Sequence, residues 1–163
     1  MKENKNFTGY SISTKLYDWL LKNISKNQTI LEIGSGTGTI ELANNFNVIS
    51  IDHNPEWINL TDKCNYILAK LKNNWYDITI LKNELPKYNY NVIIVDAPNG
   101  SKPRYGFIDN LHLFDLSNVN YIIVDDTNRE TEKKIVRYLN NNTEFKTLMT
   151  QKTNKEFTIL KKQ

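Results

Sequence analysis

The sequence predicts an α/β fold built on one doubly wound, mostly parallel sheet. The first observation is a glycine-rich loop directly after an apolar run at residues 30–33, an arrangement typical of a buried strand that turns sharply into a helix. The second is a pair of similar apolar runs, at residues 91–96 and 120–125, that each end in aspartate. The third is the alternation of such runs with segments of helical periodicity, which indicates a parallel sheet.

The elements are expected in the following order along the chain. Residues 13–24 have apolar side chains at helical spacing, and Ser13 or Thr14 can cap that helix. Strands are then expected at residues 30–33, 48–52, 66–69, 91–96 and 120–125, a short extended piece at 78–81, helices at about 39–45 and 127–140, and a closing antiparallel hairpin from 144–149 and 156–160 with its turn at Asn154.

Three of the predicted strands end in aspartate, at Asp52, Asp96 and Asp125. In open α/β sheets, ligands bind in a crevice at the carboxyl ends of the parallel strands. We therefore expect these carboxylates to line one edge of a single crevice, together with the glycine loop.

The glycine loop indicates a nucleotide-like cofactor. It contains three of the chain's six glycines, Gly34, Gly36 and Gly38, and a chain that turns sharply beside a ligand needs positions without a Cβ atom. A dinucleotide site would have Gly-x-Gly-x-x-Gly with an acidic residue about 20 positions later. Here the spacing is Gly-x-Gly-x-Gly, Asp52 supplies the acid for ribose hydroxyls, and Glu32 disfavours a pyrophosphate but suits an ammonium group. The alternative is a glycine turn with a purely architectural purpose.

At these residues the chain resembles the class I S-adenosylmethionine-dependent methyltransferases, whose sheet is Rossmann-like. Residues 31–39 are similar to the first motif of that family, and Ile51-Asp52 to the second. The resemblance implies S-adenosyl-L-methionine as cofactor, with the glycine loop against its methionine part and Asp52 on its ribose. It also implies that Glu32 acts through the loop or a bound water and that His53 reaches the ribose or the adenine edge. The predicted cofactor-binding residues are Glu32, Gly34, Ser35, Gly36, Gly38, Asp52, His53 and Asp96.

Two acidic segments bear on the methyl acceptor. Residues 96–99, Asp-Ala-Pro-Asn, lack the second proline and the aromatic residue with which methyltransferases of nucleic-acid amino groups hold a planar nitrogen, so base N-methylation loses support. Asp125-Asp126 resembles the acidic pair that metal-dependent O-methyltransferases of the catechol type place after the fifth strand. Oxygen ligands suit Mg²⁺ or another divalent cation, which predicts a metal site at Asp96, Asp125 and Asp126. The alternative is that these aspartates cap the loops and the helix that follow.

The second half of the chain also resembles the plant glucuronoxylan 4-O-methyltransferase family, which methylates sugar hydroxyls in polysaccharides. The matching segments are Asp-Ala-Pro-Asn-Gly at residues 96–100, Pro-Arg at 103–104, and residues 126–132. Asp125 replaces the family's histidine, and the glycine expected before the arginine is missing. The resemblance implies O-methylation of a sugar or another small polar hydroxyl acceptor. The predicted catalytic residues are Asp96, Arg104 and Asp126.

Size and charge limit the remaining alternatives. A length of 163 residues predicts a single domain over 1–163, and a net charge of +3 without a basic run makes a nucleic-acid partner unlikely. No apolar run reaches the roughly 20 residues of a membrane helix, and a lone cysteine, Cys64, predicts a cytoplasmic protein. Two alternatives stay open: a methyltransferase acting on nucleic acid or protein, and a non-catalytic cofactor-binding subunit. A homodimer or a partner subunit could supply acceptor contacts.

Overall fold

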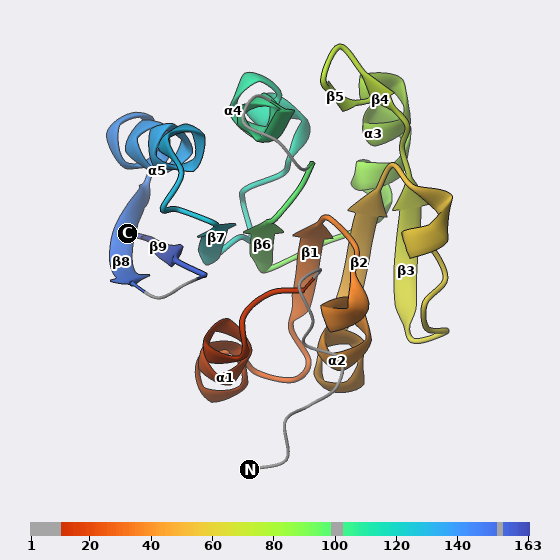
Figure 1. The fold of residues 1–163 in the computed structure, drawn as a ribbon, viewed down its shortest axis with the longest axis horizontal. Coiled ribbons are helices and arrows are strands. Elements are labelled where there is room, and N and C mark those ends of the chain that lie inside the picture. Colours follow the sequence, from red (N-terminus) through yellow and green to blue (C-terminus); the bar gives the residue numbers. More distant parts are fainter. Residues whose placement is uncertain (1–10, 99–102, 153–154) are drawn as a thin grey trace.

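The computed structural model describes residues 11–98, 103–152 and 155–163, and these form one central sheet with helices on both faces (Figure 1). The seven strands of the sheet lie in the order β3-β2-β1-β6-β7-β9-β8. They are β1 (Thr29–Ile33), β2 (Asn47–Asp52), β3 (Cys64–Leu68), β6 (Val92–Val95), β7 (Tyr121–Asp125), β8 (Phe145–Gln151) and β9 (Phe157–Lys162). The helices are α1 (Thr14–Asn23), α2 (Thr37–Asn45), α3 (Ile78–Glu84), α4 (Gly106–Asp109) and α5 (Glu130–Asn142). A separate two-stranded ribbon pairs β4 (Leu71–Lys72) with β5 (Trp75–Tyr76).

Strand pairing confirms the predicted fold class. β1 pairs in parallel with both β2 and β6, and β6 pairs in parallel with β7. β9 is antiparallel to β7 and β8, so the chain ends in the expected antiparallel hairpin, whose predicted turn at Asn154 lies outside the described residues. After β1, the chain first adds β2 and β3 on one side of this strand, and then crosses to its other side to form β6. The crevice between β1 and β6 is therefore the topological switch point of the sheet.

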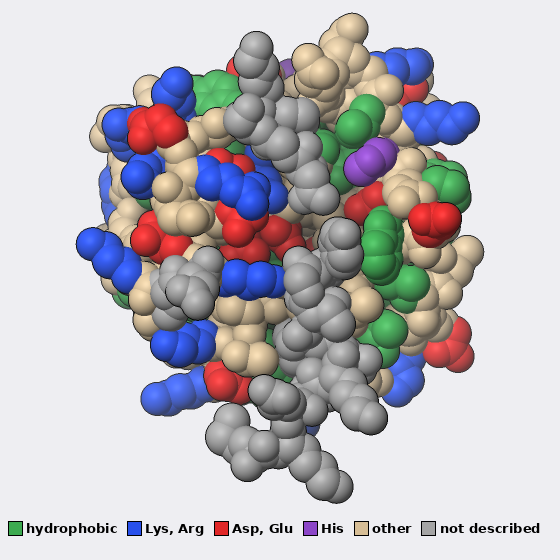
Figure 2. All heavy atoms as spheres, viewed as in Figure 1, with side chains coloured by type: hydrophobic (Ala, Val, Ile, Leu, Met, Phe, Trp, Pro, Cys, Tyr) green, Lys and Arg blue, Asp and Glu red, His purple; other side chains and the backbone are tan. Residues whose placement is uncertain are grey.

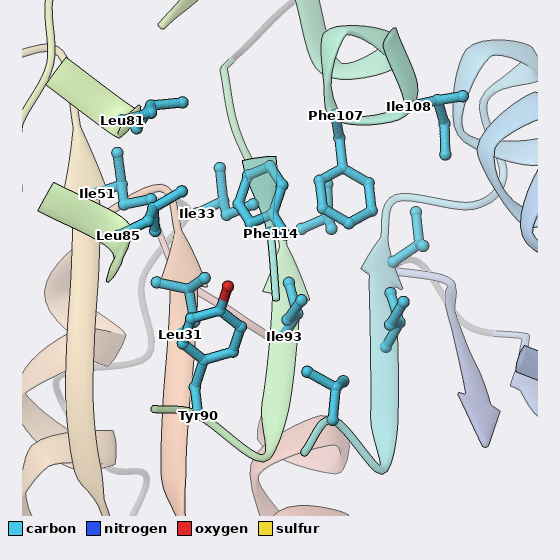
Figure 3. Packing of buried hydrophobic residues seen from close by; sticks show 14 of the residues in the cluster. Leu31, Ile33, Ile51, Leu81, Leu85, Tyr90, Ile93, Phe107, Ile108 and Phe114 are labelled. Carbon is cyan, nitrogen blue, oxygen red and sulfur yellow. The ribbon is translucent and has the colours of Figure 1, made fainter. Parts of the chain in front are cut away.

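The core consists of two apolar layers, one on each face of the sheet. Helices α1 and α2 cover one face, and α3, α4 and α5 cover the other (Figure 1). Figure 3 shows the second layer, in which Leu31 and Ile93 of the sheet lie with Phe107 of α4. Because side chains on both faces are buried, the central strands are continuous apolar runs.

The extended piece predicted at residues 78–81 is wrong, because this segment is the start of α3. Its β-branched residues favour a strand locally, but the Asp77 side chain accepts a hydrogen bond from the Thr79 backbone N–H and caps a helix. Leu81 and Leu85, four residues apart, are both buried against the sheet. Tertiary packing therefore overrides the local preference.

Helix α5 begins at Glu130, later than the predicted residue 127. Asp126 has a left-handed backbone with φ of 57°, and Arg129, the N-cap residue, is extended, so the segment before Glu130 cannot continue the helix backwards. The other predicted helices and strands are present with shifts of a few residues at their ends. Across the described part of the chain, we find no helix with the length and apolar character needed to cross a membrane.

Candidate active site

A cavity of about 600 Å³ opens at the carboxyl ends of β1, β2, β6 and β7, where the switch point of the sheet lies. Figure 2 shows carboxylate side chains gathered near the middle of this face, with basic side chains beside them. Seven of the predicted site residues line the cavity: Gly34, Ser35, Asp52, His53, Asp96, Asp125 and Asp126. Within the described part of the chain, the lining also includes Ser11, Asn54, Trp57, Ala97, Arg129 and Lys155. It does not include Glu32, Gly36, Gly38 or Arg104.

Of the three glycines in the loop, Gly34 is the one that lines the cavity. This residue has φ of +111°, and a Cβ atom added to it would lie 2.4 Å from the Cβ of Ala97, which follows β6. Its backbone N–H donates to the carbonyl of Ile51 at 2.8 Å. A side chain would therefore be strained by the backbone and would collide with the neighbouring strand end. Position 34 must be glycine for β1 and β6 to meet here.

Glu32 lies beneath the loop rather than in the cavity. It is 3% exposed, and its Oε2 accepts hydrogen bonds from the hydroxyls of Thr39, at 2.7 Å, and Ser50, at 2.6 Å. Thr39 in turn accepts from the Gly36 N–H. Burial raises the pKa of the Glu32 carboxyl to about 7, although both hydroxyls oppose this shift. Its position fits an action on the ligand through the loop.

Asp52, at the end of β2, is the acidic residue that the second motif predicts. Its Oδ2 accepts from the Ser35 N–H at 3.0 Å, and its Oδ1 accepts from the Asn54 N–H at 2.8 Å. These two bonds orient the carboxylate, and each oxygen keeps a further lone pair. The Nδ1 atom of His53 lies 3.4 Å from Asp52 Oδ1, and Trp57 also lines the cavity. This end of the cavity can accept hydrogen bonds from a ligand with neighbouring hydroxyls.

The opposite end of the cavity holds the three predicted metal-binding aspartates. One oxygen from each of Asp96, Asp125 and Asp126 lies within 4.8 Å of the others. Asp125 is 2% exposed, and its Oδ1 is buried without a hydrogen-bond partner among the described residues. Burial raises the pKa of the Asp96 carboxyl well above its usual value; the charge of Asp125 adds to this rise and Arg104 opposes it. Acidic groups that are this close and this poorly solvated favour a proton or a cation among them.

Arg104 is completely buried beside these carboxylates and has no surface in the cavity. It donates to the backbone carbonyls of Asp96 and Asp125, and its Nη1 lies 3.2 Å from Asp126 Oδ2. The same Nη1 also lies 3.4 Å from Oε1 of Glu132 on α5, which is fully buried too. The arrangement does not suit a residue that contacts substrate, and we infer that Arg104 holds the ends of β6 and β7 together.

Several residues of the site were not anticipated from the sequence. Glu132 looks like a surface residue of an amphipathic helix, and only its buried partner reveals otherwise. Ser50 interrupts the apolar run of β2, which is a signal that could have marked it. Arg129 is another such residue, and its Nη1 lies 3.1 Å from Asp126 Oδ2. A polar residue within a buried strand can therefore mark a site residue in the sequence. Ion pairs between side chains of separate loops and helices cannot be recognised from the sequence.

Comparisons with known proteins give a fold but no family. No family model matches the chain, and no curated protein matches it. Among solved structures, a candidate caffeoyl-CoA O-methyltransferase from Staphylococcus aureus is 16% identical with a TM-score of 0.58, covering 90% of this chain and 81% of that one. TrmK of M. capricolum, solved with S-adenosyl-homocysteine, is 15% identical with a TM-score of 0.61, covering 93% and 69%.

A third similar structure is MycE, a methyltransferase of the mycinamycin biosynthetic pathway, solved with Mg, S-adenosyl-homocysteine and mycinamycin VI. It is 12% identical with a TM-score of 0.61, and the match covers 91% of this chain but 49% of MycE. Identities this low establish a shared fold and nothing finer. The chain therefore has the Rossmann-like fold of the class I methyltransferases.

Proposed function

We propose that this protein is an S-adenosylmethionine-dependent methyltransferase that acts on a hydroxyl group. The observation that carries the proposal is the pairing, within one cavity, of a glycine loop that excludes a side chain at Gly34 with the oriented carboxylate of Asp52. The loop suits the methionine part of the cofactor, and Asp52 suits its ribose hydroxyls. Asp96 lies in the same cavity, where the acceptor would meet the methyl group.

Asp96 is the proposed proton acceptor. The cofactor supplies a methyl group on a sulfonium sulfur, and its transfer to a hydroxyl oxygen leaves S-adenosylhomocysteine. As the oxygen–carbon bond forms, Asp96 accepts the proton that the hydroxyl loses. Alignment of the two reactants by the protein can contribute roughly 7–11 kcal/mol.

We further propose that Asp96, Asp125 and Asp126 hold a divalent cation such as Mg²⁺. The buried, unpartnered Oδ1 of Asp125 and the spacing of the three carboxylates support a fit to a hard cation. Such an ion would lower the pKa of a hydroxyl bound beside it. Arg104 and Arg129 both lie within ion-pair distance of Asp126, but Arg104 is also shared with the buried Glu132, so these two guanidinium groups face four carboxylates and do not balance them.

The acceptor is proposed to be a sugar or another small polar molecule, following the partial resemblance of residues 96–132 to enzymes that methylate sugar hydroxyls. An RNA acceptor is the second candidate, because tRNA methyltransferases are among the similar structures. The low net charge of +3 favours the first. We also propose that a second copy of the chain or a partner subunit completes the acceptor site. The protein is proposed to be cytoplasmic, and to be an enzyme rather than a non-catalytic subunit.

Isothermal titration calorimetry tests the cofactor. We expect S-adenosylmethionine and S-adenosylhomocysteine to bind the wild-type protein and NAD to fail. Asp52→Ala should weaken binding of both, whereas Asp62→Asn, which removes an exposed carboxyl, serves as the matched control. Binding of NAD without binding of S-adenosylmethionine would overturn the proposal.

Transfer of a radiolabelled methyl group tests the acceptor. The panel contains monosaccharides, uronic acids, xylan fragments, catechol and unmodified tRNA, each with and without Mg²⁺. Labelled sugars would support the first acceptor class and labelled tRNA the second. Labelling that persists in the Asp96→Asn variant would refute the assignment of Asp96 as the proton acceptor.

A further inference from the structure

A chain of hydrogen bonds runs beneath the glycine loop, from the cavity to the buried carboxylate of Glu32. The hydroxyl oxygens of Ser35 and Ser50 are 2.7 Å apart. The Ser50 hydroxyl donates to Glu32 Oε2 at 2.6 Å, and the Thr39 hydroxyl donates to the same oxygen at 2.7 Å. Ser50 has no exposed surface and Glu32 is 3% exposed, so neither can reach a ligand. Ser35 is partly exposed and lines the cavity.

When Glu32 is ionised, the direction of every bond in this chain follows from counting protons. A hydroxyl group has one proton to donate, and an ionised carboxylate has none. Because Ser50 gives its proton to Glu32, the Ser50 oxygen can only accept from Ser35. The Ser35 proton is thereby committed to Ser50. Towards the cavity, the Ser35 oxygen can offer a lone pair but no proton.

The backbone holds Ser35 in the position that this arrangement needs. Its N–H donates to Asp52 Oδ2, so the residue is fixed between β1 and β2. On the other branch, the committed proton of Thr39 leaves its oxygen to accept from the Gly36 N–H at 3.0 Å. Glu32 therefore orders both hydroxyl branches under the loop, and only the Ser35 branch reaches the cavity.

We propose that the Ser35 hydroxyl is a hydrogen-bond acceptor for the ammonium group of the cofactor's amino-acid part, and that Ser50 and Glu32 are positioning residues that fix this polarity. The inference rests on the proposed function, since it assumes that the glycine loop faces that part of the cofactor. The fixed polarity of the Ser35 hydroxyl makes the site selective for a ligand group that donates a hydrogen bond at this position. Without Ser50, the Ser35 hydroxyl is free to rotate, and the selectivity is lost.

Two analogues of S-adenosylhomocysteine separate the ammonium from the carboxylate. The 3-thiopropylamine analogue of adenosine keeps the amine, and the 4-thiobutyrate analogue keeps the acid. Both are titrated by calorimetry, beside S-adenosylhomocysteine, at about pH 8.5, where the Glu32 carboxyl is ionised. The proteins are wild type, Ser35→Ala, Ser50→Ala and the double variant. Thr158→Val, which removes another buried hydroxyl with a hydroxyl partner, is the matched control.

We expect Ser35→Ala to weaken binding of the amine analogue by about tenfold, the value of one charge-assisted hydrogen bond. Ser50→Ala should weaken it by a smaller factor, because the freed Ser35 hydroxyl keeps its lone pairs, and both variants should change binding of the acid analogue by less than about twofold. The double variant should bind the amine analogue as Ser35→Ala does, because Ser50 acts through Ser35. Equal losses for both analogues, or additive losses in the double variant, would overturn the inference while leaving the cofactor assignment intact. Failure of the wild-type protein to bind S-adenosylhomocysteine would instead overturn the proposed function, and this inference with it.

Discussion

Replacement of Glu32 by glutamine is expected to change how stability depends on pH. The Glu32 carboxyl is buried, and its pKa in the folded protein is about 7 against 4.5 for the free side chain. Between these two values the folded chain holds a proton that the unfolded chain has lost. The free energy of unfolding therefore falls as the pH rises through this range, and it does not fall further above it. The shift corresponds to about 3 kcal/mol.

The measurement is urea denaturation followed by tryptophan fluorescence, from about pH 4 to about pH 8, without cofactor. Because glutamine does not titrate, the difference in unfolding free energy between wild type and Glu32→Gln isolates this group. We expect wild type to lose about 3 kcal/mol relative to the variant as the pH rises. The Asp62→Asn variant controls for the loss of one carboxyl from the chain. Parallel curves for wild type and Glu32→Gln would refute the reasoning, since they would mean that Glu32 ionises at the same pH in both states.

Three further predictions concern the loop and the acidic end of the cavity. Gly34→Ala should abolish S-adenosylmethionine binding in calorimetry and lower the unfolding free energy by about 1–3 kcal/mol or more, because its Cβ meets Ala97 at 2.4 Å; retained binding would contradict the loop geometry. Arg104→Met should destabilise the fold in urea by about 3–5 kcal/mol, because it leaves Glu132 buried and uncompensated, whereas Arg137→Met, which breaks an exposed ion pair on α5, should cost less than about 1 kcal/mol. Asp96→Asn should lower methyl transfer by at least about a hundredfold with cofactor affinity kept within about threefold, and unchanged transfer would remove Asp96 from the mechanism.

The sequence was sufficient to predict the sheet and most of the cavity. Apolar runs and helical periodicity depend on neighbouring residues, so the strands ending in Asp52, Asp96 and Asp125 could be identified locally. The rule that parallel strands present their carboxyl ends at one edge then placed these residues together, and all three line the cavity. The segment at 78–81 was mistaken because its β-branched residues favour a strand until the sheet buries Leu81 against it.

The roles of two charged side chains could not be predicted in the same way. Arg104 lies in a loop with no periodic pattern, and nothing nearby in the chain indicates that it is fully buried. Its partner Glu132 is on α5, after the next strand, and both become internal only when α5 packs on the sheet. The burial of an ion pair depends on elements that are remote in sequence, so it follows from packing alone.

By itself, the sequence determined the α/β class, the glycine-rich turn and the acidic strand ends, because each depends on residue types within a few positions of one another. Only the tertiary structure decided that Glu32 lies under the loop, that Ser50 connects it to Ser35, and that Arg104 is inside the protein. The physical reason is that a hydrogen bond or an ion pair requires atoms within a few ångströms. Such distances between separate strands and loops are set by how the whole chain packs.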